Sequence, residues 1–240
     1  MQRTGLALEA AQINAASSGT KVVRRRFGNI NVTDIRISRS DARKIGKSAG
    51  RYITIEGSTS EHAVPVLLKN ALRQFLPLVG TILAVGLGNP DIAKDSLGSR
   101  VIQKLRIGRL GGRVVAMETD VAAKTGIETA RMVRGVAKEL DVACVLAVDA
   151  LACCDPLKIG RTLQVSDTGI QPGSGVHEDS PALTLDFVGV PVIAVGVPMV
   201  SELSGITMDT AHKGYLAAPA NEDELAEMWA EVIASAVNSV

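Results

Sequence analysis

Short apolar runs alternate with amphipathic segments through the middle and the C-terminal part of the chain. The apolar runs predict buried strands: "TILAVG" (81–86), "GRVVAM" (112–117), "VACVLAVDA" (142–150) and "GVPVIAVGVP" (189–198). The intervening and following segments have helical spacing: "DSLGSRVIQKLRI" (95–107), "GIETARMVRGVAKEL" (126–140) and "NEDELAEMWAEVIASAV" (221–237). Strands that are apolar on both faces must be covered on both faces, so this alternation predicts an α/β fold with a mostly parallel sheet.

The N-terminal part has a different pattern. "INVTDIRIS" (30–38) and "RYITIEG" (51–57) alternate roughly between polar and β-branched residues, which predicts strands with one solvated face. Helices are predicted up to about residue 18 and over "SEHAVPVLLKNALRQFL" (60–76), and "RTLQVS" (161–166) is a further strand that leads into a long Gly/Pro/Ser-rich loop. Without a repeat or a clear linker, residues 1–240 are expected to form one three-layer sandwich of phosphorylase/hydrolase-like type, extended by the N-terminal strands.

Composition and charge exclude several classes of function. The formal net charge of +1 gives no electrostatic case for nucleic acid or an anionic membrane, and the three consecutive arginines Arg24–Arg26 are typical of a solvated edge. Three cysteines do not make a disulfide framework, and neither a secretory signal nor an apolar run of membrane-spanning length is present. A cytoplasmic protein is expected.

The stretch "AVGLGNPDIAKDSLGSR" first suggests a phosphate-binding loop. A dinucleotide fingerprint needs a third glycine, but Asp91 stands at that position after Gly86 and Gly88. A carboxylate there, followed by Asp95, would repel a phosphate. The nucleotide reading is therefore disfavoured.

Asp95 and Asp149 each follow or end a predicted parallel strand. Either carboxylate could simply cap a helix, because aspartate is among the best N-cap residues. Open α/β sheets, however, place their ligands at the carboxyl ends of the strands. If the strand order is 2-1-3, counted from "TILAVG", the two strands are neighbours and the carboxylates face each other. Such a pair would share a proton, as acid/base activation of water against a peptide carbonyl requires.

Other nucleophile or metal sites are less well supported. The histidines His62, His177 and His212 do not accompany a G-x-S-x-G nucleophile elbow, and no Cys/His spacing resembles a zinc site. The adjacent Cys153 and Cys154 are typical of small core residues. A metal-dependent peptidase would need a third ligand beside the aspartates, such as His177.

Several motifs together resemble the germination protease family of spore-forming bacteria. They are "GLGNPDIAKDSLGS", "KTGIET", "AVDALA", "SDTGIQPGSGV" and "GVPVIAVGVP", in the family's order, with weaker similarity at both ends of the chain. The family's fold is similar to that of the hydrogenase-maturation endopeptidases. Its members are atypical aspartic-type endopeptidases that degrade small acid-soluble spore proteins at germination.

The resemblance carries over residue by residue. The family's catalytic aspartates match Asp95 in "KDSLGS" and Asp149 in "VDALA", and no metal or cofactor is implied. It further implies a cytoplasmic homotetramer of the forespore or spore core. That tetramer is made as a zymogen and cleaved at a bond that matches Gly5–Leu6, where glycine replaces the family's aspartate.

Gly-rich polar loops beside buried strands often bind ligands, although they can also be plain connections. The residues expected to line the cleft are Gly86, Gly88, Asn89, Thr125, Gly126, Glu128, Ser166 and Asp167. Three functions remain open at this point: an aspartate-pair endopeptidase, a metal-dependent maturation-type peptidase, and a peptide-binding scaffold in which both aspartates only cap helices.

Overall fold

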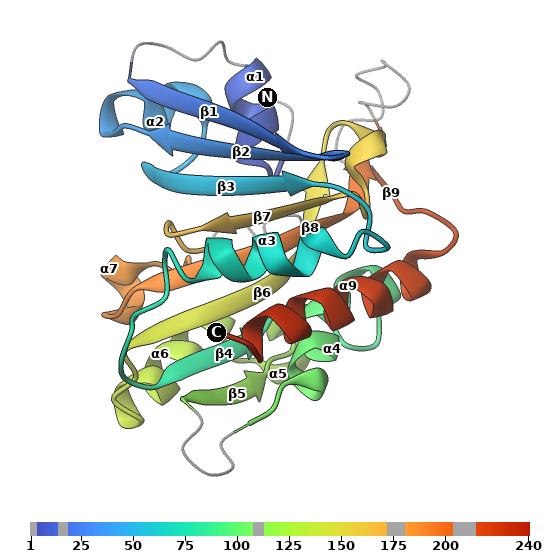
Figure 1. The fold of residues 1–240 in the computed structure, drawn as a ribbon. Helices are drawn as coiled ribbons and strands as arrows, with labels where there is room; N and C mark the ends of the chain where they lie inside the picture. Colours follow the sequence, from blue (N-terminus) through green and yellow to red (C-terminus); the bar gives the residue numbers. More distant parts are fainter. Residues whose placement is uncertain (1–3, 14–18, 108–112, 172–180, 204–214) are drawn as a thin grey trace.

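One continuous mixed sheet forms the centre of the molecule in the computed structural model, which describes residues 4–13, 19–107, 113–171, 181–203 and 215–240. Across the described residues the strand order is β1-β2-β3-β7-β8-β6-β4-β5, and β9 pairs with β8 (Figure 1). The strands are β1 (Thr20–Phe27), β2 (Ile30–Ile37), β3 (Gly50–Glu56), β4 (Ile82–Gly86), β5 (Val114–Glu118), β6 (Cys144–Cys153), β7 (Thr162–Ser166), β8 (Val192–Glu202) and β9 (Leu216–Ala217).

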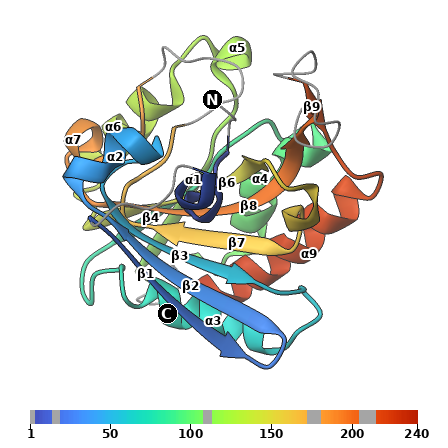
Figure 2. The ribbon, with the colours of Figure 1, turned by 90° about the horizontal axis from the view of Figure 1, so that it is seen from above.

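Helices cover both faces of this sheet, as the three-layer prediction required (Figures 1 and 2). The helices α3 (Ala63–Leu72), α4 (Leu97–Lys104) and α9 (Glu222–Val237) pack on one face. The other face carries α1 (Ala7–Ile13), α2 (Arg39–Ile45), α6 (Thr129–Glu139) and α7 (Leu185–Val188), while α5 (Ala122–Thr125) lies near the end of β5. No helix of the described part is long and apolar enough to cross a membrane.

The strand alternation explains why two helical layers are needed. In β4, Ile82 and Ala84 belong to the core beneath α3, α4 and α9, whereas Leu83 and Val85 belong to the core beneath α6. Every residue of β4 is buried. A strand without a polar face is stable only between two covering layers, so the apolar runs in the sequence fixed this architecture.

The α/β prediction is confirmed, and its parallel part is limited to four strands. The pairs β4–β5, β4–β6 and β6–β8 are parallel, whereas β7 and β1–β3 run antiparallel to their neighbours. The sheet is therefore mixed. The N-terminal strand extension is confirmed as well, and it continues the same sheet through the β3–β7 pair.

Five α-helices and strands of the described residues are absent from the sequence prediction: β1, α2, α5, α7 and β9. Four of them are short, with two to seven residues. The fifth, β1, has eight residues, but all except Thr20 are exposed, so it lacks the alternation of buried and exposed positions that identifies a strand.

A close approach of α4 to the sheet determines where the chain leaves β4. A Cβ atom on Gly98 would lie 2.4 Å from both the backbone N and O of Leu87 and 2.7 Å from the carbonyl oxygen of Val148. A Cβ atom on Gly86 would lie 2.5 Å from the carbonyl oxygen of Gly98. Only glycine fits at both positions, and the first turn of α4 therefore rests directly on the backbones of β4 and β6.

Replacing Gly98 by alanine should separate α4 from the sheet. We expect Gly98→Ala to lower the free energy of unfolding by about 1–3 kcal/mol or more, the usual cost of overpacking, measured by urea denaturation. The matched control is Gly135→Ala in α6, where an added Cβ meets nothing within 4 Å. That variant should gain roughly 0.5–1 kcal/mol through helix propensity. Equal effects of the two substitutions would contradict the contact.

Candidate functional site

Two neighbouring parallel strands, β4 and β6, bring Asp95 and Asp149 to the same edge of the sheet. The order β5-β4-β6 is the 2-1-3 arrangement on which the sequence argument depended. The ladder between β4 and β6 ends at the pair Gly86 and Val148, and the Leu87 N–H then donates to the Val148 carbonyl at 2.9 Å. Asp149 follows this point directly, within β6 rather than beyond its end, because β6 continues along β8 to Cys153.

Asp95 is held by the turn that leaves β4. Gly88 has a φ of +100°, and a Cβ atom there would lie 2.1 Å from the Asp95 carbonyl oxygen and 2.9 Å from its Oδ1. The backbone N–H of Asn89 donates to Asp95 Oδ2 at 2.7 Å. Glycine therefore lets the turn close beneath the carboxylate, and the next residue binds it.

The helix-cap alternative does not describe either aspartate in the structure. The N-cap of α4 is Ser96, and Asp95 ends the short 3₁₀ helix Ala93–Asp95 that precedes it. Its carboxylate accepts from the earlier turn, at Asn89, and Asp149 Oδ1 accepts from the N–H of Ala150 within its own strand at 2.9 Å. Both carboxylates thus bind backbone amides without beginning a helix.

Lys124 on α5 binds side chains of the turn that precedes Asp95. Lys124 Nζ donates to Asn89 Oδ1 at 3.0 Å and to Asp120 Oδ2 at 3.0 Å, and it also pairs with Asp91. The side chain of Asn89 additionally accepts from the Asp91 N–H at 3.0 Å, which closes a small turn. Sequence reasoning missed Lys124, although its spacing of four residues from Asp120 is a common separation for an ion pair.

Both carboxylates have a raised pKa, and the charge of Asp95 contributes to the shift of Asp149. Burial raises the pKa of Asp149 well above 3.8, the negative charge of Asp95 raises it further, and only the N–H of Ala150 opposes the shift. Burial also raises the pKa of Asp95, against the lowering by the Asn89 N–H and the charge of Lys94. Asp149 is 7% exposed whereas Asp95 is partly exposed, so a proton is held more strongly at Asp149.

A glutamine lies level with Asp149 on the same sheet face. Gly196 of β8 pairs with Asp149 on one side and with Gln164 of β7 on the other. A Cβ atom on Gly196 would lie 2.6 Å from Leu151, whose side chain fills the space over this glycine. Gln164 was missed by sequence reasoning; a polar residue in an otherwise apolar strand was the available signal.

Gln164 binds the N-terminal segment. Its Oε1 accepts from the Ala7 N–H at 2.7 Å and its Nε2 donates to the Gly5 carbonyl at 3.2 Å. Gly5 also donates to the Ala152 carbonyl at 2.7 Å, and Leu6 is fully buried. The Gly5–Leu6 bond, which matches the family's processing site, is thus packed against the end of β6.

Three of the remaining predicted cleft residues lie at or after the end of α5. Thr125 and Gly126 are exposed at the end of α5, and Glu128 precedes α6 and pairs with Arg131. This loop follows Lys124 of α5 directly. Gly86, by contrast, is buried beneath α4.

The structure does not bring Ser166 and Asp167 to the pair. They follow Gln164 along β7, which runs antiparallel to β8 and so leads away from Asp149. Asp167 accepts from the Arg51 N–H at 2.7 Å at the start of β3. Its carboxylate therefore joins the end of β7 to β3.

Candidate metal ligands are not gathered in the described part of the chain, where no three His, Cys, Asp or Glu side chains could hold an ion together. His62 is the exposed N-cap residue of α3. His177 and His212 lie outside the described residues.

Comparison with known proteins identifies relatives of the chain. Residues 6–217 match the family described as Germination protease. The chain is 34% identical to the germination protease of Clostridium tetani, covering 87% of this chain and 73% of that protein. It is 33% identical to that of Bacillus subtilis, again over 87% of this chain but only 65% of the relative's length.

Among solved structures, a NiFe hydrogenase maturation protease from Thermococcus kodakarensis is similar over 70% of this chain and 98% of its own, with a TM-score of 0.46 and 19% identity. The family match and the curated relatives both extend across most of the chain, including both aspartates. The chain belongs to the germination protease family.

Proposed function

We propose that the protein is an endopeptidase that hydrolyses small acid-soluble spore proteins during germination, with Asp95 and Asp149 as its catalytic residues. One observation carries the chemical part of this proposal. The charge of Asp95, which follows β4, raises the pKa of Asp149 on the neighbouring strand β6, and burial raises the pKa of both. Strongly perturbed carboxyl groups at the carboxyl ends of parallel strands are typical of acid/base sites in α/β proteins.

The two environments suggest different roles for the two aspartates. In this proposal Asp149, the more buried carboxyl, holds the shared proton. Burial raises the pKa of Asp95 as well, but the Asn89 N–H favours its charged form. Asp95 therefore acts as the general base and Asp149 as the general acid. The contacts of Lys124 with Asn89 and Asp91 hold the turn that leads to Asp95.

The proposed reaction needs only water and the peptide bond. Asp95 takes a proton from a water molecule as the water oxygen bonds to the peptide carbonyl carbon, and Asp149 donates its proton to the carbonyl oxygen. The C–N bond then breaks, the proton on Asp95 passes to the leaving amine, and Asp149 regains a proton as the new carboxyl group forms. Each turnover returns the pair to its starting protonation state.

The family relationship supports further parts of the proposal. We propose that the chain acts in the spore cytoplasm, that it assembles as a homotetramer, and that it is made as a zymogen cleaved at the Gly5–Leu6 bond. Because that bond is packed between Gln164 and the end of β6, its cleavage would require this segment to leave the sheet.

The direct test is incubation of the purified chain with a small acid-soluble spore protein, followed by mass spectrometry of the products. We expect Asp95→Asn and Asp149→Asn each to lower the cleavage rate by about 10²–10⁴-fold, the usual contribution of a positioned acid or base. The control is Asp186→Asn, which changes an exposed carboxylate in the first turn of α7.

Cleavage by the wild type and by Asp186→Asn, with loss in both site variants, supports the proposal. Full activity of Asp149→Asn would contradict the pair mechanism, and a wild type that never cuts a spore protein would contradict the function.

The raised pKa of Asp149 also predicts a pH-dependent stability. A carboxyl whose pKa is higher in the folded state contributes stability below its unfolded pKa and loses this contribution as the pH rises through the folded pKa. We therefore expect Asp149→Asn, which cannot ionise, to match the wild type in melting temperature near about pH 4 and to exceed it near about pH 8. Differential scanning calorimetry at both pH values measures this difference. A stability difference that is the same at both pH values would contradict a buried ionisable Asp149.

A further inference from the structure

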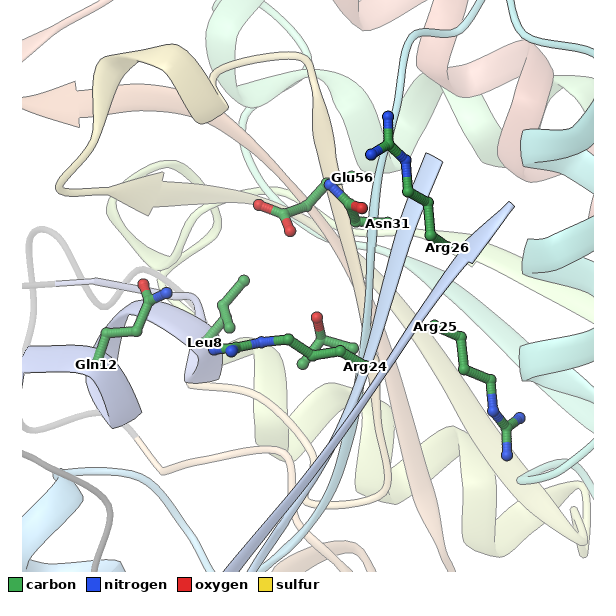
Figure 3. A pocket seen from close by; sticks show the side chains of 8 residues that line it. Leu8, Gln12, Arg24, Arg25, Arg26, Asn31 and Glu56 are labelled. Atoms are coloured by element: carbon green, nitrogen blue, oxygen red, sulfur yellow. The ribbon is translucent and has the colours of Figure 1, made fainter. Parts of the chain in front are cut away.

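The exposed edge strand β1 carries a concentration of positive charge that the catalytic pair does not use. The strand "TKVVRRRF" contains Lys21, Arg24, Arg25 and Arg26 and no acidic residue. Register with β2 places Arg24 opposite Thr33 and Arg26 opposite Asn31, so these two arginines share the sheet face that also carries α1. Arg25 points to the other face (Figure 3).

A pocket of about 440 Å³ lies between this strand and α1. Figure 3 shows Arg24 extending from β1 toward Leu8 of α1, with Asn31 and Glu56 on the neighbouring strands. Gln12 of α1 completes the opposite wall. The pocket thus combines guanidinium and amide donors with a small apolar surface.

These arginines have no acidic partner among the described residues. Arg26 Nε donates to the Gly28 carbonyl at 2.8 Å. Glu56, the acidic residue that lines the pocket, is already bound to Lys158 Nζ at 2.7 Å. The positive charge of Arg24 and Arg26 is therefore not neutralised within the described part of the chain.

The outer edge of β1 also has unpaired backbone groups. β1 is the first strand in the sheet order and pairs only with β2 in the described structure. Its eight residues form a regular antiparallel ladder with β2. Exposed apolar side chains accompany the cations: Val22 is 36%, Val23 37% and Phe27 46% exposed. A long, regular edge of this kind is a template for an added strand.

We propose that β1 is a docking site for an extended acidic polypeptide segment, which adds to the sheet as a further strand. Side chains two residues apart on an added strand face the same side, about 6.6–7 Å apart, as Arg24 and Arg26 do on β1. Acidic residues at alternate positions pair with these arginines at the pocket. The residues between them face Val23, Arg25 and Phe27 on the other side. Backbone hydrogen bonds provide affinity, and the charges provide selectivity.

Charge argues against a second copy of this chain as the partner. Antiparallel pairing of two β1 strands would bring four cationic residues of each copy onto adjacent strands, without an acidic residue to separate them. Like charges across a strand pair are destabilising. The free edge is thus protected from self-association by the residues that would attract an acidic strand.

The shape of the site argues against nucleic acid. A nucleic acid cannot pair with a backbone ladder, and its binding depends mainly on phosphate contacts from lysine and arginine side chains. The three consecutive arginines offer few phosphate contacts. The exposed side chains of Val22, Val23 and Phe27 make their surroundings too apolar for such a surface.

Fluorescence anisotropy with labelled peptides tests the proposal on the full chain. The probe is a 12-residue peptide in which Glu and Val alternate, compared with Ser/Val and Lys/Val peptides of the same length. We expect the Glu/Val peptide to bind at least about tenfold more tightly than the Ser/Val peptide, and the Lys/Val peptide not to bind. A Glu/Val peptide that is N-methylated at alternate residues keeps its charge but cannot pair fully, and we expect it to lose at least about tenfold in affinity.

The matched protein variants are R24E/R26E and the control R73E/K138E, which reverses the same number of exposed charges outside β1. The first should lose Glu/Val peptide binding and the second should retain it, with both melting as the wild type does. Equal binding by the two variants would overturn the assignment to β1. Equal binding of the N-methylated peptide or of a DNA oligonucleotide of the same charge would overturn strand addition, as would a wild-type dimer that R24E/R26E dissociates.

Discussion

The contact between the first turn of α4 and the backbones of β4 and β6 determines the geometry of the candidate active site. Gly98 and Gly86 allow an approach that any side chain would prevent. Through it, the turn after β4 is held against β6, and the short 3₁₀ helix that carries Asp95 is placed opposite Asp149. Packing of backbone on backbone leaves little freedom, because interiors adjust poorly to added volume. The site is therefore positioned by the core itself, and Lys124 of α5 adds a contact to the turn before Asp95.

This position also explains the unusual ionisation of the pair. A single buried carboxylate is unfavourable, and a second one nearby makes it more so. The Asn89 and Ala150 amides each offset part of that cost by donating to one aspartate. The raised pKa of Asp149 thereby lowers the stability of the fold at neutral pH, a cost that is common at functional sites.

Arg24 of the proposed docking strand and Asp149 of the aspartate pair lie on the same face of the sheet, which also carries α1. A continuous row of paired residues runs between them: Arg24, Thr33, Thr54, Gln164, Gly196 and Asp149. Five steps between strands correspond to about 24 Å. The N-terminal segment bound by Gln164 crosses this row. A polypeptide held at β1 and cut at the pair would have to span that distance on a path around α1.

The sequence by itself determined the α/β class and the apolar strands, and it predicted that Asp95 and Asp149 approach each other. Its apolar runs, such as "TILAVG", must be buried on both faces. Rules for the connections between such strands then leave only a few possible strand orders. Local patterns could not identify β1, whose side chains are exposed on both faces, or the antiparallel direction of β7. Nor could they place Asp167 beside Arg51, away from the pair, or join Lys124 to Asn89 and Gln164 to the N-terminal segment. Those contacts link residues 35 to 159 positions apart, and only the tertiary structure decides them, because they depend on which backbones approach closely rather than on the residues along one segment.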